Sequence, residues 1–237
     1  MARGKKLIFN NMKRTFNMAT IPPRIKTAID TINSVYDQSD VIRLYLNNFK
    51  TVPKEFIREK IEIHQGEDLR STGKLFWAMN PDEYYFCIDD DLIYPPTYAE
   101  DMVNKLNEYD DKIVVSLHGK RLKEGHKKSY FRSFTMSLHC LGNVNEDTFV
   151  HVIGNGVSAF NTNNVKIDYT KFKYHYMDDI EVSIQLQKQN IPALVRAHKQ
   201  NYLIYNKPKG LTLFEEYNKN DATQAEMINT IEWTLVE

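Results

Sequence analysis

Apolar runs alternate with segments of helical period through the first half of this 237-residue chain, and this alternation limits the possible folds most. Runs rich in β-branched and aromatic residues indicate strands, and apolar residues spaced three or four apart indicate helices. Strands that alternate with helices form a largely parallel sheet with helices on both faces. The sequence therefore predicts an α/β protein with a mixed, mostly parallel central sheet. The expected strands are 16–20, 41–46, 60–64, 84–88 and 112–117, and the expected helices are 23–36, 72–79 and 97–109.

The second half of the chain is less regular. Residues 119–145 are basic and show no clear period, which predicts a mobile loop. Beyond them, the pattern indicates strands at 149–153, 193–195 and 202–205 and helices at 178–188 and 223–235. Because no repeat, low-complexity tract or linker interrupts the chain, we expect one domain over residues 1–237.

Overall composition excludes several classes of protein. Basic and acidic residues number 31 each, so a formal net charge of zero gives no general attraction to nucleic acid or to an anionic membrane. No apolar stretch approaches the length of a membrane span and no signal-peptide pattern is present, so we expect a soluble, cytoplasmic protein. Cys87 and Cys140 are too few for a disulfide framework and lack zinc-type spacing.

Basic residues nevertheless gather in two stretches. A solvated tail and a solvated loop would explain them, and contact with an anionic substrate is the sharper alternative. The two stretches contain Arg3, Lys5, Lys6, Lys13 and Arg14, and then Lys120, Arg121, Lys123, Lys127, Lys128 and Arg132, opposed in the second case only by Glu124.

Three carboxylates, Asp89, Asp90 and Asp91, follow directly on the apolar run 84–88. Adjacent negative charges at a strand end cost free energy unless a cation or hydrogen-bond donors compensate them. Asp89 and Asp91 together offer the oxygen ligands that Mg²⁺ or Mn²⁺ prefers. An acidic turn before the next helix is the simpler alternative. In open parallel sheets ligands bind beyond the carboxyl ends of the strands, so these acids, Thr20 and Asn47 should share one edge.

Four motifs in order resemble nucleotide-sugar glycosyltransferases of the GT-A fold, most closely the inverting, family-2-like kind. The resemblance covers roughly residues 14–200 and implies a nucleotide-binding half (14–118), an acceptor or catalytic half (119–206) and a C-terminal extension (207–237). The chain lacks the C-terminal Q-x-x-R-W signature of processive synthases, which favours transfer of one sugar at a time. The motifs are Ala19-Thr20-Ile21-Pro22-Pro23-Arg24, Ser71-Thr72-Gly73-Lys74, Ile88-Asp89-Asp90-Asp91 and Met177-Asp178-Asp179-Ile180-Glu181.

The resemblance also assigns residues to the donor. Arg24 could pair with phosphate, although a surface position on the first helical turn would explain it equally well. The segment Ser71-Thr72-Gly73-Lys74 could equally be a plain helix start. The glycines of Gly154-Asn155-Gly156 could likewise form a simple tight turn. The donor-binding set implied by the resemblance is Thr20, Pro22, Arg24, Asp68, Lys74, Asp89, Asp90, Gly154, Asn155 and Gly156.

For the metal, the resemblance implies Mn²⁺ or Mg²⁺ on Asp89 and Asp91, with His198 as a further ligand; a structural role is the alternative for this lone histidine. For the acceptor, it implies Asp179 as the catalytic base, with Asp178 and Glu181 as acidic neighbours. Capping of the helix 178–188 by these acids is an alternative that is compatible with the base role.

The resulting expectation is a metal-dependent transfer from a nucleoside-diphosphate sugar, with UDP as the default carrier, to a hydroxyl acceptor. The acceptor would be a glycan, or a polyanion such as a teichoic-acid-like polymer or modified DNA that contacts residues 120–132. Two rivals are a phosphotransferase of the haloacid dehalogenase type, which also places Asp-x-Asp at a strand end, and an inactive nucleotide-sugar-binding protein. Ile93 stands where the phosphotransferase motif expects Thr or Val.

Overall fold

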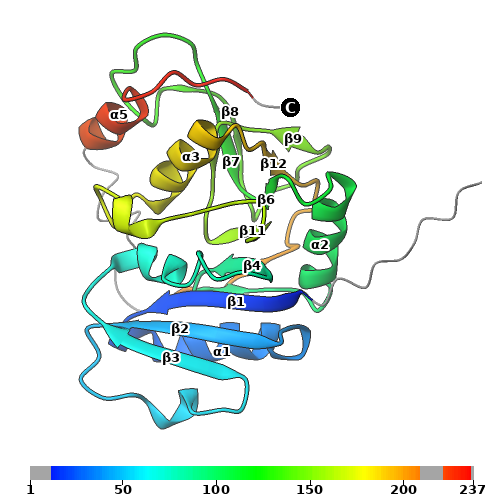
Figure 1. Ribbon diagram of the computed structural model, residues 1–237, viewed down its shortest axis with the longest axis vertical. Coiled ribbons are helices and arrows are strands. Elements are labelled where there is room, and N and C mark those ends of the chain that lie inside the picture. Colours follow the sequence, from blue (N-terminus) through cyan, green and yellow to red (C-terminus); the bar gives the residue numbers. More distant parts are fainter. Residues whose placement is uncertain (1–11, 209–220, 236–237) are drawn as a thin grey trace, which may run out of the picture.

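The computed structural model describes residues 12–208 and 221–235, and within them a mixed eight-stranded sheet forms the centre of the molecule (Figure 1). Its strand order is β3-β2-β1-β4-β11-β6-β12-β9. Neighbours run parallel from β3 to β4 and again between β6 and β12, and the other pairs are antiparallel. The predicted α/β class with a mostly parallel sheet is confirmed. The strands of this sheet are β1 Lys13–Thr20, β2 Val41–Asn47, β3 Ile61–Gly66, β4 Glu83–Ile88, β6 Val114–Ser116, β9 Thr148–Phe149, β11 Val157–Asn161 and β12 Ala193–Val195.

Helices cover both faces of the sheet, as the alternation predicts. Successive residues of a strand point to opposite faces, so Phe86 of β4 stacks on Phe16 of β1 at 4.5 Å between ring centroids, whereas Tyr85 stacks on Phe160 of β11 at 5.1 Å. The Phe86 face packs against α1 and α2, and the Tyr85 face packs against α3. Figure 1 shows α2 and α3 to either side of β6 and β12. The helices are α1 Ile25–Val35, α2 Tyr98–Glu108, α3 Asp178–Gln189 and α5 Ala222–Ile228.

No helix within the described parts of the chain is long and apolar enough to cross a membrane. Short 3₁₀ turns link several elements, and one of them replaces the α-helix expected at 72–79. There the N–H and hydroxyl of Thr72 bond to the carbonyl of His175, and Gly73 lies against the Tyr45 ring, so the segment is held by tertiary contacts. These turns are η1 Pro22–Arg24, η2 Tyr36–Gln38, η3 Lys54–Phe56, η4 Arg70–Leu75 and η5 Tyr169–Lys171.

The expected mobile loop at 119–145 is wrong. Its ends form an antiparallel hairpin, β7 Gly119–Leu122 and β8 Phe134–Leu138, which joins β10 Val152–Ile153 in a three-stranded sheet. The charged residues of this stretch obscure the pattern of its apolar residues in the sequence. Leu122, Tyr130 and Phe134 pack with residues of α3 and α5, and this apolar cluster orders the hairpin.

Four other elements differ from expectation. The single strand expected at 149–153 is divided, because β9 pairs with β12 in the central sheet while β10 pairs with β7. Strand β11 was not predicted; it lies buried and antiparallel between β4 and β6. The strand expected at 202–205 shortens to β13 Ile204–Tyr205, paired with β5 Leu92–Ile93, and the final helix is the shorter α5. Arg3, Lys5, Lys6 and part of the extension 207–237 lie outside the described residues.

Candidate functional site

The carboxyl ends of β1 and β4 meet, as the sequence predicts. The register pairs Met18 of β1 with Ile88, the last residue of β4, so Thr20 at the end of β1 lies beside the acids that follow β4. There the Thr20 hydroxyl donates to Asp90 Oδ2 at 2.7 Å. The nearby strand end of β2 contributes Asn47, whose side chain bonds instead to the backbone of Leu69 and Arg70. The shared edge is therefore real, and Thr20 and Asp90 are in direct contact on it.

Arg24 neutralises part of the acid triplet. Its Nη1 lies 2.8 Å from Asp90 Oδ1 and 3.6 Å from Asp91 Oδ2, and its side chain is largely buried. Burial opposes the guanidinium charge, but the carboxylates outweigh it and raise the pKa of Arg24. Pro22, the other residue expected here, begins η1 and is exposed. Arg24 thus forms ion pairs with Asp90 and Asp91, and phosphate binding by Arg24 stays a prediction.

The three acids of the triplet occupy different environments. Burial raises the pKa of Asp90, although Arg24 and the Thr20 hydroxyl counteract the shift. For Asp91, burial and then the negative charges of Asp89 and Asp90 raise the pKa to about 7. The Arg24 charge therefore does not fully compensate Asp91, and an added cation near this carboxylate would be favourable.

Lys74 links the two predicted acid motifs. This buried lysine of η4 forms an ion pair with Asp89, and its Nζ lies 3.6 Å from Asp178 Oδ2. Burial alone would lower the pKa of Lys74, but the charges of Asp89 and then Asp178 raise it overall. Asp178 is further held by the Ser71 hydroxyl and by the Asn155 amide at 2.9 Å. Lys74, expected beside the donor, thus lies between the acids after β4 and those that open α3.

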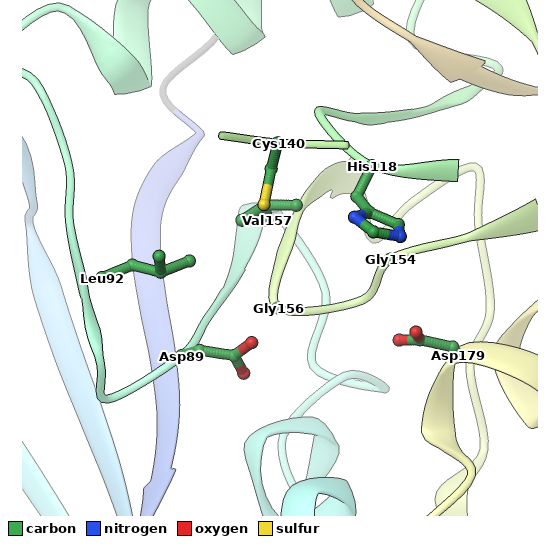
Figure 2. A pocket seen from close by; sticks show the side chains of 8 residues that line it. All are labelled: Asp89, Leu92, His118, Cys140, Gly154, Gly156, Val157 and Asp179. Carbon is green, nitrogen blue, oxygen red and sulfur yellow. The ribbon is translucent and has the colours of Figure 1, made fainter. Parts of the chain in front are cut away.

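Asp179 faces a pocket of about 190 Å³ opposite Asp89 (Figure 2). It is the second residue of α3, and its Oδ1 accepts the backbone N–H of Asn155 at 2.7 Å. Burial and the neighbouring charge of Asp178 raise the pKa of Asp179 to about 7. A carboxylate that titrates near neutral pH can take a proton from a hydroxyl group, as the predicted base must. The complete lining is Asp89, Leu92, His118, Cys140, Gly154, Gly156, Val157 and Asp179.

The two glycines of the 154–156 loop allow close approach by side chains that line the pocket. A Cβ atom on Gly156 would lie 1.8 Å from Asp89 Oδ2, and one on Gly154 would lie 2.6 Å from the Cβ of His118. The Gly156 carbonyl also accepts a hydrogen bond from the Tyr94 hydroxyl at 2.7 Å. These glycines therefore make room for Asp89 and His118, whereas their expected approach to a donor sugar stays a prediction.

Two other predicted residues, Asp68 and Glu181, make contacts away from the pocket. Asp68 accepts hydrogen bonds from the Asn48 side chain and the Arg70 backbone N–H, both at 2.9 Å. Glu181 accepts the backbone N–H groups of Lys173 and Tyr174 at 2.7 and 3.0 Å, so it braces the segment before α3.

His198, the expected further metal ligand, is buried beyond β12. Its Nδ1 lies 2.8 Å from the Arg196 carbonyl oxygen, and its Nε2 lies 3.4 Å from that of His139. These contacts fit the structural alternative, and ligation by His198 would require the ring to leave them.

Sequence reasoning missed His118 and Cys140 as members of the site, and it placed Lys120 only in the basic stretch that could contact an anionic substrate. Lys120 lies over the rings of Tyr130 and Phe134, 4.7 and 4.9 Å from their centroids. Burial lowers the pKa of Lys120, and the charge of Asp179 partly counteracts that shift. In the sequence, Lys120 is one of many basic residues, and His118 and Cys140 carry no spacing signal. Only the pairing of β7 with β8 and β10 brings these segments to the pocket.

Comparison with known proteins identifies no family for this chain. No family model matches it, and neither does any curated protein sequence. A similar solved structure is that of 4-diphosphocytidyl-2C-methyl-D-erythritol synthase from Anaerococcus prevotii DSM 20548. The two sequences are 12% identical, and the alignment covers 88% of this chain and 99% of the synthase chain with a TM-score of 0.44. At that TM-score the likeness says nothing about the reaction.

Proposed function

We propose that this protein transfers a sugar from a nucleoside-diphosphate sugar, with UDP as the default carrier, to a hydroxyl acceptor. One observation carries the proposal: Asp89 and Asp179, from separate elements, face the same pocket at the carboxyl edge of the sheet. A volume of about 190 Å³ is smaller than the roughly 300–1,000 Å³ of a typical whole-ligand site. The pocket would therefore hold the reacting groups, while the nucleotide lies along the neighbouring strand ends.

The donor side fits a hard divalent cation. Asp89 and Asp91 provide carboxylate oxygens, and burial together with the charges of Asp89 and Asp90 raises the pKa of Asp91 despite the nearby Arg24. These two residues would hold Mn²⁺ or Mg²⁺. When bound, such a cation would neutralise charge on the departing diphosphate. Lys74, paired with Asp89, places a fixed positive charge beside the same group.

The acceptor side relies on Asp179. As the acceptor oxygen attacks the anomeric carbon, its proton passes to the Asp179 carboxylate and a new carbon–oxygen bond forms. The bond between that carbon and the diphosphate breaks, and its electron pair leaves with the diphosphate. A single in-line displacement of this kind inverts the anomeric configuration. The Asn155 N–H, at 2.7 Å from Asp179 Oδ1, holds the base in place.

The acceptor is proposed more broadly, as a glycan or a polyanion. The hairpin β7–β8 carries exposed Lys123, Lys128 and Arg132, which could contact phosphates. Lys120 and Arg121 are less free to do so. Lys120 is covered by aromatic rings, and the Arg121 side chain donates to the Phe149 carbonyl at 2.7 Å.

The proposal is tested with a panel of UDP-, GDP- and CDP-sugars, each with Mn²⁺ or with EDTA. A true donor should raise the melting temperature only when metal is present, and should be hydrolysed slowly or transferred. Asp179→Asn should reduce turnover about 10²–10⁴-fold and keep UDP binding, because loss of a general base affects the chemical step.

Asp37→Asn, at an exposed aspartate of η2, is the matched control and should retain full turnover. Absence of stabilisation by every sugar nucleotide would refute the proposal. Unchanged turnover in Asp179→Asn would remove Asp179 as the base. Binding without turnover in the wild type would favour the inactive binding protein, and a trapped aspartyl-phosphate on Asp89 would favour the phosphotransferase.

A further inference from the structure

Two histidines and a cysteine cluster beside the pocket, and two of them, His118 and Cys140, line its wall away from the acid motifs. His118 follows β6, and His139 and Cys140 follow β8. Their potential ligand atoms all lie within 4.8 Å of one another, and the two imidazole rings are 5.0 Å apart. Figure 2 shows the His118 ring and the Cys140 sulfur on the same side of the pocket, across from Asp89 and Asp179. The glycosyl-transfer proposal uses none of these three residues.

The backbone around His118 is tightly held. Its carbonyl accepts the Gly154 N–H at 2.7 Å and the Ser116 hydroxyl at 3.0 Å. The bare Cα of Gly154 leaves the space in which His118 packs. His139 and Cys140 instead lie in a turn closed by the Gly142 N–H on the His139 carbonyl at 2.8 Å. The cluster thus pairs one fixed ligand with two on a short turn that can adjust.

Opposite charges lie on either side of this cluster, the negative charge of Asp89 and the positive charge of Lys120. Burial, followed by the charge of Lys120, lowers the pKa of His118 to about 3, so its imidazole is neutral and a lone pair is free for a metal. Burial and the charge of Asp89 raise the pKa of Cys140 to about 12. The same negative charge attracts a dication, and a bound metal would release the thiol proton and stabilise the thiolate.

We propose that His118, His139 and Cys140 bind a zinc-class transition-metal cation with an open coordination position toward the pocket. Two imidazole nitrogens and a thiolate suit Zn²⁺ or Co²⁺ and do not suit Mg²⁺. Three protein ligands with a free fourth position are the arrangement found in catalytic zinc sites. A water molecule or a substrate oxygen would complete the coordination. This site is separate from the oxygen site at Asp89 and Asp91.

The geometry requires a small closure of the cluster. Tetrahedral zinc with bonds of about 2.0–2.3 Å places its ligand atoms roughly 3.3–3.8 Å apart, compared with the present limit of 4.8 Å. The turn at His139 can supply this movement. The backbone N–H of Leu141 donates to His139 Nδ1 at 3.2 Å. A metal bound to Nε2 leaves the ring proton on Nδ1, so this hydrogen bond would have to break.

Cobalt substitution tests the site directly. Reduced, metal-free protein is titrated with Co²⁺, and visible and near-ultraviolet absorption are recorded for the wild type, Cys140→Ser and His118→Ala. We expect one tetrahedral Co²⁺ per chain with a sulfur-to-cobalt charge-transfer band. The band should be absent in Cys140→Ser, and Zn²⁺ affinity should fall about 100-fold or more in both variants. His126→Ala, at an exposed histidine of the β7–β8 hairpin, is the matched control and should keep the spectrum.

The alternative outcomes are distinct. A weak spectrum without the sulfur band, lost in Asp91→Asn and unchanged in Cys140→Ser, would place the metal on the acids and overturn the proposal. Absence of Co²⁺ binding would also overturn it. Zn²⁺ should in addition protect half-buried Cys140 from alkylation, whereas fully buried Cys87 should not react in either state. Because Asp179→Asn removes the base and leaves these ligands intact, its cobalt spectrum should equal that of the wild type whether or not the protein transfers sugars.

Discussion

Asp179→Asn should stabilise the protein at neutral pH, because the folded state raises the pKa of Asp179 to about 7 from 3.8. Between these values the folded chain binds a proton that the unfolded chain has released. Stability therefore falls as pH rises through this window. A difference of about three pKa units corresponds to a ceiling of about 4 kcal/mol. Partial exposure of Asp179 to the pocket reduces this figure, and we expect about 1–3 kcal/mol at pH 8.

The Asn side chain removes the charge and keeps an oxygen that can accept the Asn155 N–H, which lies 2.7 Å from Asp179 Oδ1 in the wild type. Wild type and Asp179→Asn are compared by thermal melting and urea unfolding at pH 4 and pH 8, in EDTA so that metal does not mask the acids. Near pH 4 the two should have similar stability, since the carboxyl group is then protonated when folded. At pH 8 the variant should melt about 2–12 °C higher, using about 2–4 °C per kcal/mol for a chain of this size.

Asp37→Asn controls for a general loss of negative charge and should show no such pH-dependent difference. A variant that is equally stable or less stable than wild type at pH 8 would refute the reasoning. It would mean that Asp179 is ionised at little cost, and a base with a pKa near neutrality would then be unsupported. The shift in pKa and the assignment of the base would fail together.

Three further perturbations test the site. Gly156→Ala should displace Asp89, because the added Cβ would lie 1.8 Å from its Oδ2. Thermal melts should show a loss of about 1–3 kcal/mol in stability, and Mn²⁺ titration should show weaker binding. Unchanged metal binding would contradict the donor role of Asp89. Lys74→Met should cost about 3 kcal/mol in urea unfolding, because Asp89 and Asp178 lose their shared cation; an equally stable variant would contradict that link. If the acceptor is a polyanion held by residues 123–132, log K for a teichoic-acid-like polymer or DNA should fall linearly with log salt, by about 0.7–0.9 per phosphate contact; salt-independent binding would exclude this acceptor.

The parallel half of the fold was predictable because each strand there carries its own apolar signal. The runs around Phe16, Leu44 and Phe86 are buried on both faces, so burial and sequence pattern coincide. The antiparallel strand β11 gave no comparable signal, since its short run Val157–Asn161 directly follows the glycine loop. In the β7–β8 hairpin the charges dominate the pattern, and only tertiary contacts of Tyr130 and Phe134 with α3 and α5 order it.

The site was predictable where it depends on strand ends and unpredictable where it depends on the hairpin. The rule that parallel strands end on one edge brings Thr20 and Asp90 together, and the distance of 2.7 Å confirms it. His118 and Cys140 reach the pocket through the pairing of β7 with β8 and β10. The sequence analysis predicted a mobile loop in place of this hairpin. Residue type alone gave Cys140 no role, because two cysteines of unrelated spacing indicate neither a disulfide framework nor a zinc site.

The acid triplet shows why adjacent, chemically identical residues need not share a function. After β4 ends at Ile88 the side chains point in different directions. Asp90 turns to Thr20 and Arg24, which bond to both of its oxygens at 2.7 and 2.8 Å. Asp89 reaches Lys74 and the pocket, and Asp91 lies 3.6 Å from Arg24 Nη1. Asp90 thus braces the junction of β1, β4 and η1, and in the proposed function Asp89 and Asp91 are the two acids that would hold the cation.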